Sequence, residues 1–300
     1  MLSRTPRGLR LDGKHWTRTT ASRPAGAAKA ASAEARRLNG AAGLLAASVL
    51  ADSAVEHYRG SFQNPAMYVP LAAAALSLFG SADGAARRGG GQKRLRRAIY
   101  EAAAAVGLAG TGFHLYNVVK RPGRLSWLNL FYGAPLGAPM ALTLSGALGL
   151  AAERVRDTPP KVAPEILGLP AGRLLAALTA AGLAGTVAEA ALLHFRGAFQ
   201  NPAMYLPVSL PPVASGLMAG AALWPRRRHW LARAWLGLTA ALGLAGTGFH
   251  AYGVSRAMGG WRNWRQNVVD GPPLPAPPSF TALALAGLAA LALLEGHADE

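Results

Sequence analysis

Apolar stretches long enough to cross a membrane alternate along this chain with short segments that hold most of the charge. A transmembrane helix needs about 20 predominantly apolar residues, whereas the strands of a membrane β-barrel have about ten residues of alternating polarity. The pattern therefore predicts an all-α integral membrane protein with about eight transmembrane helices. They are expected at residues 38–58, 66–82, 98–118, 133–152, 174–195, 203–224, 234–254 and 279–294.

Three segments recur in the same order, which predicts two tandem copies of one unit. Residues 57–70 match residues 194–207 at 11 of 14 positions, and residues 107–118 match residues 243–254 at 10 of 12. A weaker match links Asn129, Gly133, Pro135, Leu136, Ala138 and Pro139 with Asn267, Gly271, Pro273, Leu274, Ala276 and Pro277. The offsets of 137, 136 and 138 residues are nearly equal, which indicates a structural repeat.

The repeat divides the chain into a tail, two membrane units and a linker. Each unit holds an even number of predicted spans, so the two copies should insert in the same direction, related by a pseudo-twofold axis along the membrane normal. The expected parts are a basic, disordered cytoplasmic tail (1–37), a first four-helix repeat (38–152), a cytoplasmic linker (153–173) and a second four-helix repeat (174–294).

The basic residues are distributed unevenly over the predicted loops. The tail and every second loop carry 23 of the 31 Lys and Arg residues, and the alternate loops carry eight. Positive residues accumulate on the cytoplasmic side of membrane proteins. We therefore expect both termini in the cytoplasm. Because 26 Arg against 5 Lys, with abundant Ala and Gly, is typical of GC-rich bacteria, the expected location is the bacterial inner membrane.

Composition also limits the chemistry. A net charge of +17 is compatible with nucleic-acid binding, but the charges are scattered over the ends of apolar segments. The lipid bilayer is therefore the expected partner, and nucleic acid is not. The chain contains no Cys, which excludes disulfides and thiolate metal sites, so a metal or haem would depend on His, Met, Tyr or carboxylate ligands.

The two copies agree best where the chain is predicted to face the periplasm. His114 and His250 lie about 17 residues into predicted helices that begin on the cytoplasmic side. This corresponds to a rise of roughly 25 Å, which places both residues near the outer interface. The candidate site residues are the four histidines His57, His114, His194 and His250, with Arg59, Arg196, Gln63, Gln200, Asn64, Asn201, Tyr68, Tyr205, Tyr116 and Tyr252.

Two acids lie slightly deeper at matching positions, Asp52 and Glu189, each five residues before a candidate His. Ionisable groups within spans usually face a bundle interior or a water-filled cavity. Five residues correspond to about 500° of helical rotation, so acid and His do not share a helix face. We expect any partner of these acids to come from another helix.

The histidines allow several interpretations. Two imidazoles from different helices could hold the iron of a haem b, with glycines of residues 107–112 and 243–248 admitting a flat macrocycle. They could bind copper or zinc, or they could fix helix ends through hydrogen bonds. The Gly-rich segments themselves follow no strand, so close helix packing is expected there rather than phosphate binding.

These interpretations leave the function open between classes, and the sequence does not decide whether the chain is an enzyme. One hypothesis is a haem-binding subunit that passes electrons between quinone and a periplasmic protein partner. Others are a small-solute transporter, suggested by the parallel repeats, an intramembrane enzyme that uses Asp52 or Glu189 with His as acid and base, and a membrane scaffold in which the recurring segments are structural.

Overall fold

A computed structural model describes residues 14–86, 92–133, 135–159, 162–225 and 229–296, with side chains from residue 31 onwards. The first part of the chain forms helices and one 3-10 turn in the order α1 (Lys14–Arg59), η1 (Pro65–Tyr68), α2 (Val69–Ala86), α3 (Lys93–Val119), α4 (Trp127–Tyr132) and α5 (Gly137–Asp157).

The second part begins with an antiparallel hairpin of two two-residue strands. It then has helices and a 3-10 turn in the same order as the first part, with one additional 3-10 turn. Its elements are β1 (Glu165–Ile166), β2 (Leu169–Pro170), α6 (Ala171–Arg196), η2 (Pro202–Tyr205), α7 (Leu206–Leu223), α8 (Trp230–Arg256), η3 (Gly260–Asn263), α9 (Trp264–Val269) and α10 (Pro278–Glu295). We refer to α1–α5 as the first half and to α6–α10 as the second half.

The chain is an all-α membrane protein. Within the described residues, six helical segments are long and apolar enough to cross a bilayer: Ala31–Arg59, Pro65–Ala86, Lys93–Val119, Ala171–Arg196, Pro202–Leu223 and Pro278–Glu295. Helices α5 and α8 lie at two further predicted spans. Four charged residues occupy the last turns of α5, and α8 includes Arg233, His250 and several glycines, which lowers the hydropathy of both helices.

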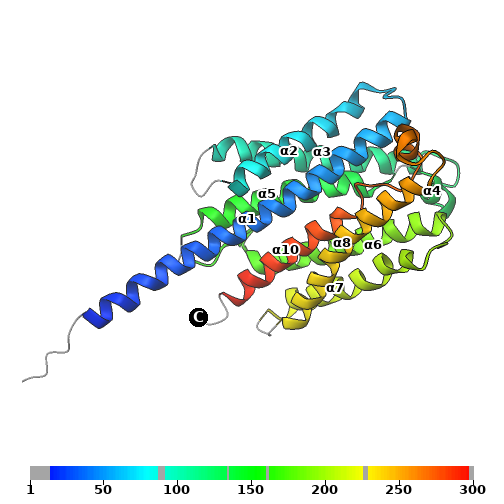
Figure 1. The fold of residues 1–300 in the computed structure, drawn as a ribbon. Helices are drawn as coiled ribbons and strands as arrows, with labels where there is room; N and C mark the ends of the chain where they lie inside the picture. Colours follow the sequence, from blue (N-terminus) through cyan, green and yellow to red (C-terminus); the bar gives the residue numbers. More distant parts are fainter. Residues whose placement is uncertain (1–13, 87–91, 134, 160–161, 226–228, 297–300) are drawn as a thin grey trace, which may run out of the picture.

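The long helices lie side by side in one bundle (Figure 1). Helix α1 packs on α2 and α5, and α3 packs on α5; in the second half α6 packs on α7 and α10, and α8 packs on α10. The halves meet where α1 contacts α10 and α5 contacts α6. Alanine, glycine and leucine fill much of the core, and such small residues let helices approach closely.

The start of α1 and the end of α10 lie at the same end of the bundle, and α4 lies at the opposite end (Figure 1). We call the end where α2, α5, α7 and α10 finish the inner end, and the end where α1, α3, α6 and α8 finish the outer end.

Helix α1 includes residues 14–37 of the segment that the sequence predicted to be a disordered tail. It begins at Lys14, so the basic segment before the first apolar stretch is helical from that residue onwards. Alanine and arginine, which are abundant there, are good helix formers, and this propensity explains the extension. Residues 1–13 lie outside the described part of the chain.

A buried ion-pair network joins α2, α3 and α5 at the inner end of the first half. The guanidinium of Arg96 donates to both carboxylate oxygens of Glu153, at 3.0 and 2.8 Å, and to Asp83 at 2.8 Å. Arg156 donates to Glu153 at 2.6 Å and to the carbonyl of Gly84 at 2.6 Å. The side chain of Glu153 is fully buried. Charges are rarely buried unless paired in this way.

Candidate functional site: the histidine layer at the outer end

The matched segments 57–70 and 194–207 form the same turn. After the helix ends, Ser61 and Phe62 adopt positive φ angles of 57° and 45°, and Ala198 and Phe199 adopt 56° and 47°. Asn64 then caps η1 by accepting a hydrogen bond from the amide of Ala66 at 2.9 Å, and Asn201 does the same for Ala203 in η2. The eleven shared residues therefore specify a shared backbone, including the Asn-Pro start of the second helix.

Each of the four candidate histidines is bound through Nδ1 to a backbone carbonyl of an outer loop or turn. His57 bonds Met67 at 2.6 Å, and His194 bonds Met204 at 2.8 Å. His114 bonds the carbonyl of Pro135, and His250 bonds that of Pro273 at 2.7 Å. A carbonyl can only accept, so Nδ1 carries the proton in all four rings. The lone pair of every imidazole is therefore on Nε2.

The structure brings two of these rings together in the second half. The ring centroids of His194 on α6 and His250 on α8 are 6.5 Å apart, with an interplanar angle of 67°. No corresponding ring contact joins His57 and His114, although both belong to the described residues. The histidine layer is therefore built alike in both halves, but only the second half pairs its imidazoles.

Aromatic stacking braces both turns beneath the histidines. Phe62 stacks on Tyr68 with centroids 4.4 Å apart, and Phe199 stacks on Tyr205 at 4.6 Å. The same Phe meets the ring of the preceding His edge-on at 6.1 Å in each half. Tyr68 and Tyr205, two of the predicted site residues, thus support the turn.

Other predicted site residues point away from the histidines. Arg59 pairs with Glu56 at 2.8 Å, and Arg196 lies over the ring of Phe131 at 5.0 Å. The remaining four are largely exposed at the outer end: Gln63, Gln200, Tyr116 and Tyr252.

The two membrane acids differ in their partners. The carboxylate of Glu189 accepts a hydrogen bond from the backbone N–H of Gly137, the first residue of α5. The Glu189 carboxylate fills the space that a side chain at position 137 would need, because a Cβ on Gly137 would lie 1.2 Å from Glu189 Oε2. Glu189 thus caps a helix of the other half, where the helix dipole favours negative charge. Asp52 is partly buried and accepts no hydrogen bond from the residues that the structure describes, and the carboxylates of Glu56 and Glu189 lie close enough to repel it.

The Gly-rich segments pack helices closely, as predicted. A Cβ on Gly107 would lie 2.5 Å from the backbone nitrogen of Thr143 in α5, and a Cβ on Gly243 would lie 2.3 Å from Thr281 in α10. Gly110 and Gly246 similarly face Pro139 and Pro277. These four glycines therefore serve helix packing, whereas a Cβ on Gly112 or Gly248 would have no neighbour within 4 Å, so these two glycines leave space beside their helices.

Each half reaches over the other at the outer end, which the sequence did not reveal. Trp127 and Phe131 of α4 contact Phe195 at the end of α6, with centroids 6.2 and 6.0 Å away. Reciprocally, Arg265 of α9 hydrogen-bonds the hydroxyl of Tyr58 at the end of α1 and lies over its ring at 5.7 Å. This hydrogen bond raises the pKa of Arg265.

The weak third match has a structural explanation as well. The side-chain amide of Asn129 donates to the carbonyls of Pro122 and Arg124, at 2.9 and 2.8 Å. Asn267 donates to the carbonyls of Met258 and Gly260, at 3.1 and 2.8 Å. One Asn therefore holds the outer loop in each half. Its recurrence in the sequence was the available signal.

Among the residues that the structure describes, no group of three or more His, Asp or Glu side chains is placed to hold a metal ion. A comparison with known protein families, with characterised proteins and with solved structures finds no match to this chain.

Proposed function

We propose that this chain is an inner-membrane protein of eight spans, in two parallel copies, that carries a haem between His194 and His250 near the periplasmic face and transfers electrons there. The observation that supports the haem is the ring separation of 6.5 Å between these two imidazoles. The periplasmic acceptor or donor would be a protein that docks on the outer end.

The bundle supports the two additional spans. Helix α5 has 21 residues and α8 has 27, which gives rises of about 32 and 40 Å, against a hydrocarbon core of about 30 Å. Helix α5 packs along α1 and α3, and α8 packs along α10, all of them candidate spans. A helix that runs beside spanning helices over this length crosses the bilayer with them.

His194 and His250 would hold the haem iron through Nε2. A metal–nitrogen bond is about 2.0–2.1 Å, and the ring centres of the two histidines are 6.5 Å apart, a separation that one shared metal could bridge. The Nδ1 hydrogen bonds to Met204 and Pro273 fix each ring and leave Nε2 for the metal, the usual support of ligating histidines.

The number of ligands favours haem over a bare ion. A zinc site takes three or four protein ligands, and the described residues offer no group of three. A haem iron needs only two from the protein, because the porphyrin supplies the other four. The bound haem would supply one-electron chemistry. The carbonyls of Met204 and Pro273 would hold the imidazole rings of His194 and His250 at the separation that the iron requires.

The test is the absorption spectrum of the full chain purified after expression with a haem precursor. We expect a bis-imidazole haem with a sharp visible band on reduction, and its loss in His194→Ala and His250→Ala. The matched controls are His57→Ala and His114→Ala, which lose the same kind of Nδ1 hydrogen bond but should retain the haem. A protein without haem, or equal loss in all four variants, would refute the assignment. Stoichiometric copper or zinc in place of haem would also refute it.

Topology is tested separately with reporter fusions. Fusions at residues 92, 158 and 225 should report the cytoplasm, and those at 62, 123, 198 and 259 should report the periplasm. A periplasmic result at 158 would contradict the parallel arrangement of the two copies.

A further inference from the structure

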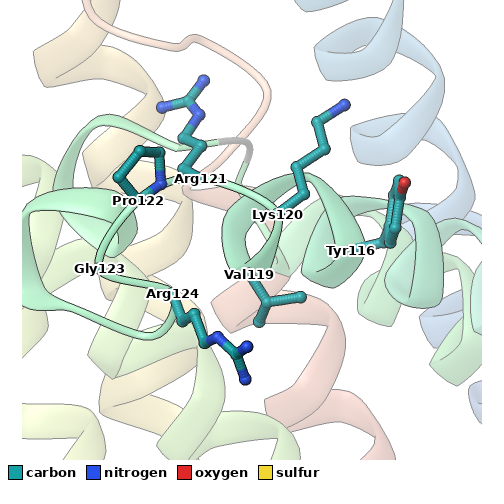
Figure 2. Close-up of a pocket in the computed structure, with 7 residues that line it drawn as sticks. All are labelled: Tyr116, Val119, Lys120, Arg121, Pro122, Gly123 and Arg124. Carbon is teal, nitrogen blue, oxygen red and sulfur yellow. The ribbon is translucent and has the colours of Figure 1, made fainter.

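A basic hollow of about 600 Å³ lies at the outer end of the first half, between the end of α3 and the loop that follows it. Figure 2 shows the side chains around it: Lys120 and Arg121 extend from one side of the loop, Arg124 extends from the other, and Tyr116 stands one turn earlier on α3. This hollow is separate from the histidine pair, which belongs to the second half.

The cations of the hollow have no acidic partner. Residues 102–152 contain no Asp or Glu at all. None of Lys120, Arg121 and Arg124 takes part in a salt bridge with any described residue, and the ammonium of Lys120 lies 5.4 Å from the ring centre of Tyr116. Three uncompensated positive charges on the predicted outer side run against the usual charge distribution of membrane proteins, so an anion is expected to neutralise them.

The loop that carries these cations is held in a fixed shape. Gly123 and Arg124 have φ angles of 84° and 48°, and Arg124 is of a residue type that rarely adopts this conformation. The two hydrogen bonds from Asn129 to the carbonyls of Pro122 and Arg124 hold it there. The backbone that carries the charged side chains is thereby held by two hydrogen bonds from Asn129 and does not depend on an ion pair.

Large apolar side chains are exposed on both sides of the hollow. They come from the outer part of α3, from the loop that follows it and from the start of α4, and they are Leu108, Phe113, Leu115, Tyr116, Leu125, Trp127 and Leu128. Within a membrane protein such a surface faces acyl chains, with Trp and Tyr at the headgroup level. A ligand of the hollow would therefore have a negative head beside the cations and an apolar body against α3 and α4.

The second half does not repeat the three cations at the matched positions. There Arg256 takes the place of Lys120, but Ala257 replaces Arg121 and Gly260 replaces Arg124. The carbonyl of Gly260 accepts the hydrogen bond from the matched Asn267. The feature is thus specific to the first half and does not follow from the shared fold.

From the charge, the fixed loop and the apolar surroundings, we propose that this hollow binds the phosphate of an anionic phospholipid of the outer leaflet. The proposal uses the membrane orientation of the proposed function but not its haem. Lys120 and Arg121 would neutralise the phosphate, because basic residues at a membrane surface attract anionic headgroups.

The experiment is native mass spectrometry of the full chain in neutral detergent, with phosphatidylglycerol or phosphatidylcholine added as the probe. We expect one retained phosphatidylglycerol per chain and little phosphatidylcholine. In Lys120→Gln/Arg121→Gln the retained phosphatidylglycerol should fall at least fivefold. The matched control is Arg256→Gln/Arg262→Gln, which removes two outer-end charges in the second half and should leave retention unchanged.

A second pair of variants separates a shaped site from charge alone. Asn129→Leu keeps all three cations but removes the hydrogen bonds that fix the loop, and it should lower retention at least threefold, whereas Asn267→Leu should not. Equal retention in the Lys120/Arg121 variant and its control would overturn the proposal. Competition by inorganic phosphate at concentrations similar to the lipid would also overturn it, because the ligand would then be a soluble anion. Bound haem in the same spectra reports on the proposed function independently.

Discussion

The two halves share the same turns at the outer end but have different cores at the inner end. At the outer end the same His, Asn and Phe residues make the same contacts in both. At the inner end the first half buries Arg96, Tyr100 and Glu153, whereas the positions matched through the continuous helices are Ala232, Leu236 and Leu291, which are also buried. One helix arrangement therefore tolerates either a charged core or an apolar core.

The comparison shows that the ion-pair network is not needed to build the fold. A neighbouring position also has a polar residue in the first half and an apolar one in the second. Asn39 accepts a hydrogen bond from Tyr100 at 2.6 Å, and its matched position in the second half is the buried Ala176. Buried ion pairs often stabilise a protein no better than apolar side chains of similar volume. The network does tie α2, α3 and α5 together through directional bonds, so it restricts how these helices can shift.

The largest expected effect comes from breaking this network on one side. Glu153→Leu leaves the guanidinium of Arg96, which is 2% exposed, without its bidentate partner. Unfolding in detergent should require about 3–5 kcal/mol less free energy. The double variant Arg96→Ala/Glu153→Leu imports the residues of the second half and should regain part of that loss. A double variant less stable than Glu153→Leu would contradict this explanation. Leu291→Met, the matched control, should cost less than about 1.5 kcal/mol.

A smaller effect is expected at two matched glycines. A Cβ on Gly149 would lie 2.3 Å from the ring of Tyr100, whereas a Cβ on Gly287 would lie 2.9 Å from a methyl group of Leu236. An aromatic ring in a buried hydrogen bond cannot move as easily as a leucine methyl. Gly149→Ala should therefore destabilise by about 1–3 kcal/mol and Gly287→Ala by clearly less, as measured by thermal unfolding. Equal losses would show that the two cores are equally adaptable.

At the outer end the halves should respond alike. His57→Ala and His194→Ala each remove one hydrogen bond to a turn carbonyl, so the haem-free protein should lose about 1 kcal/mol of stability in both cases. Guanidinium or thermal unfolding of the two variants side by side measures this. A difference larger than about 1 kcal/mol would mean that the shared turns do not contribute equally.

The smallest effect is expected for the exposed contact between α9 and α1. Tyr58→Phe removes the hydroxyl that accepts from Arg265 but keeps the ring beneath the guanidinium. Both side chains are exposed, so the thermal unfolding of the full chain should change less than in any variant above. A larger loss would indicate that this contact, unlike ordinary surface pairs, helps to hold the halves together.

The sequence predicted the helical elements well because long apolar stretches and a repeat leave few alternatives. It also placed the histidines near the ends of their helices. Their partners could not be predicted, because Met67 and Pro273 bind through carbonyls that carry no residue-specific signal. The pairing of Arg96 with Glu153 could not be predicted either, because 57 residues separate them and helix rotation is not fixed by sequence. The contact of Glu189 with Gly137 required the packing of two halves.

The contacts of α4 with the end of α6, and of α9 with the end of α1, also suggest how such a protein arose. Each half places side chains of its short helix on the end of the other half's first long helix. A gene for one half alone would encode a chain with an unfilled surface at that end, which a second identical chain could cover by exchanging the short helix. We expect that the two halves, expressed as separate polypeptides in one cell, would assemble with each other. Fusion would then have allowed one half to change its inner core while the exchanged ends stayed matched.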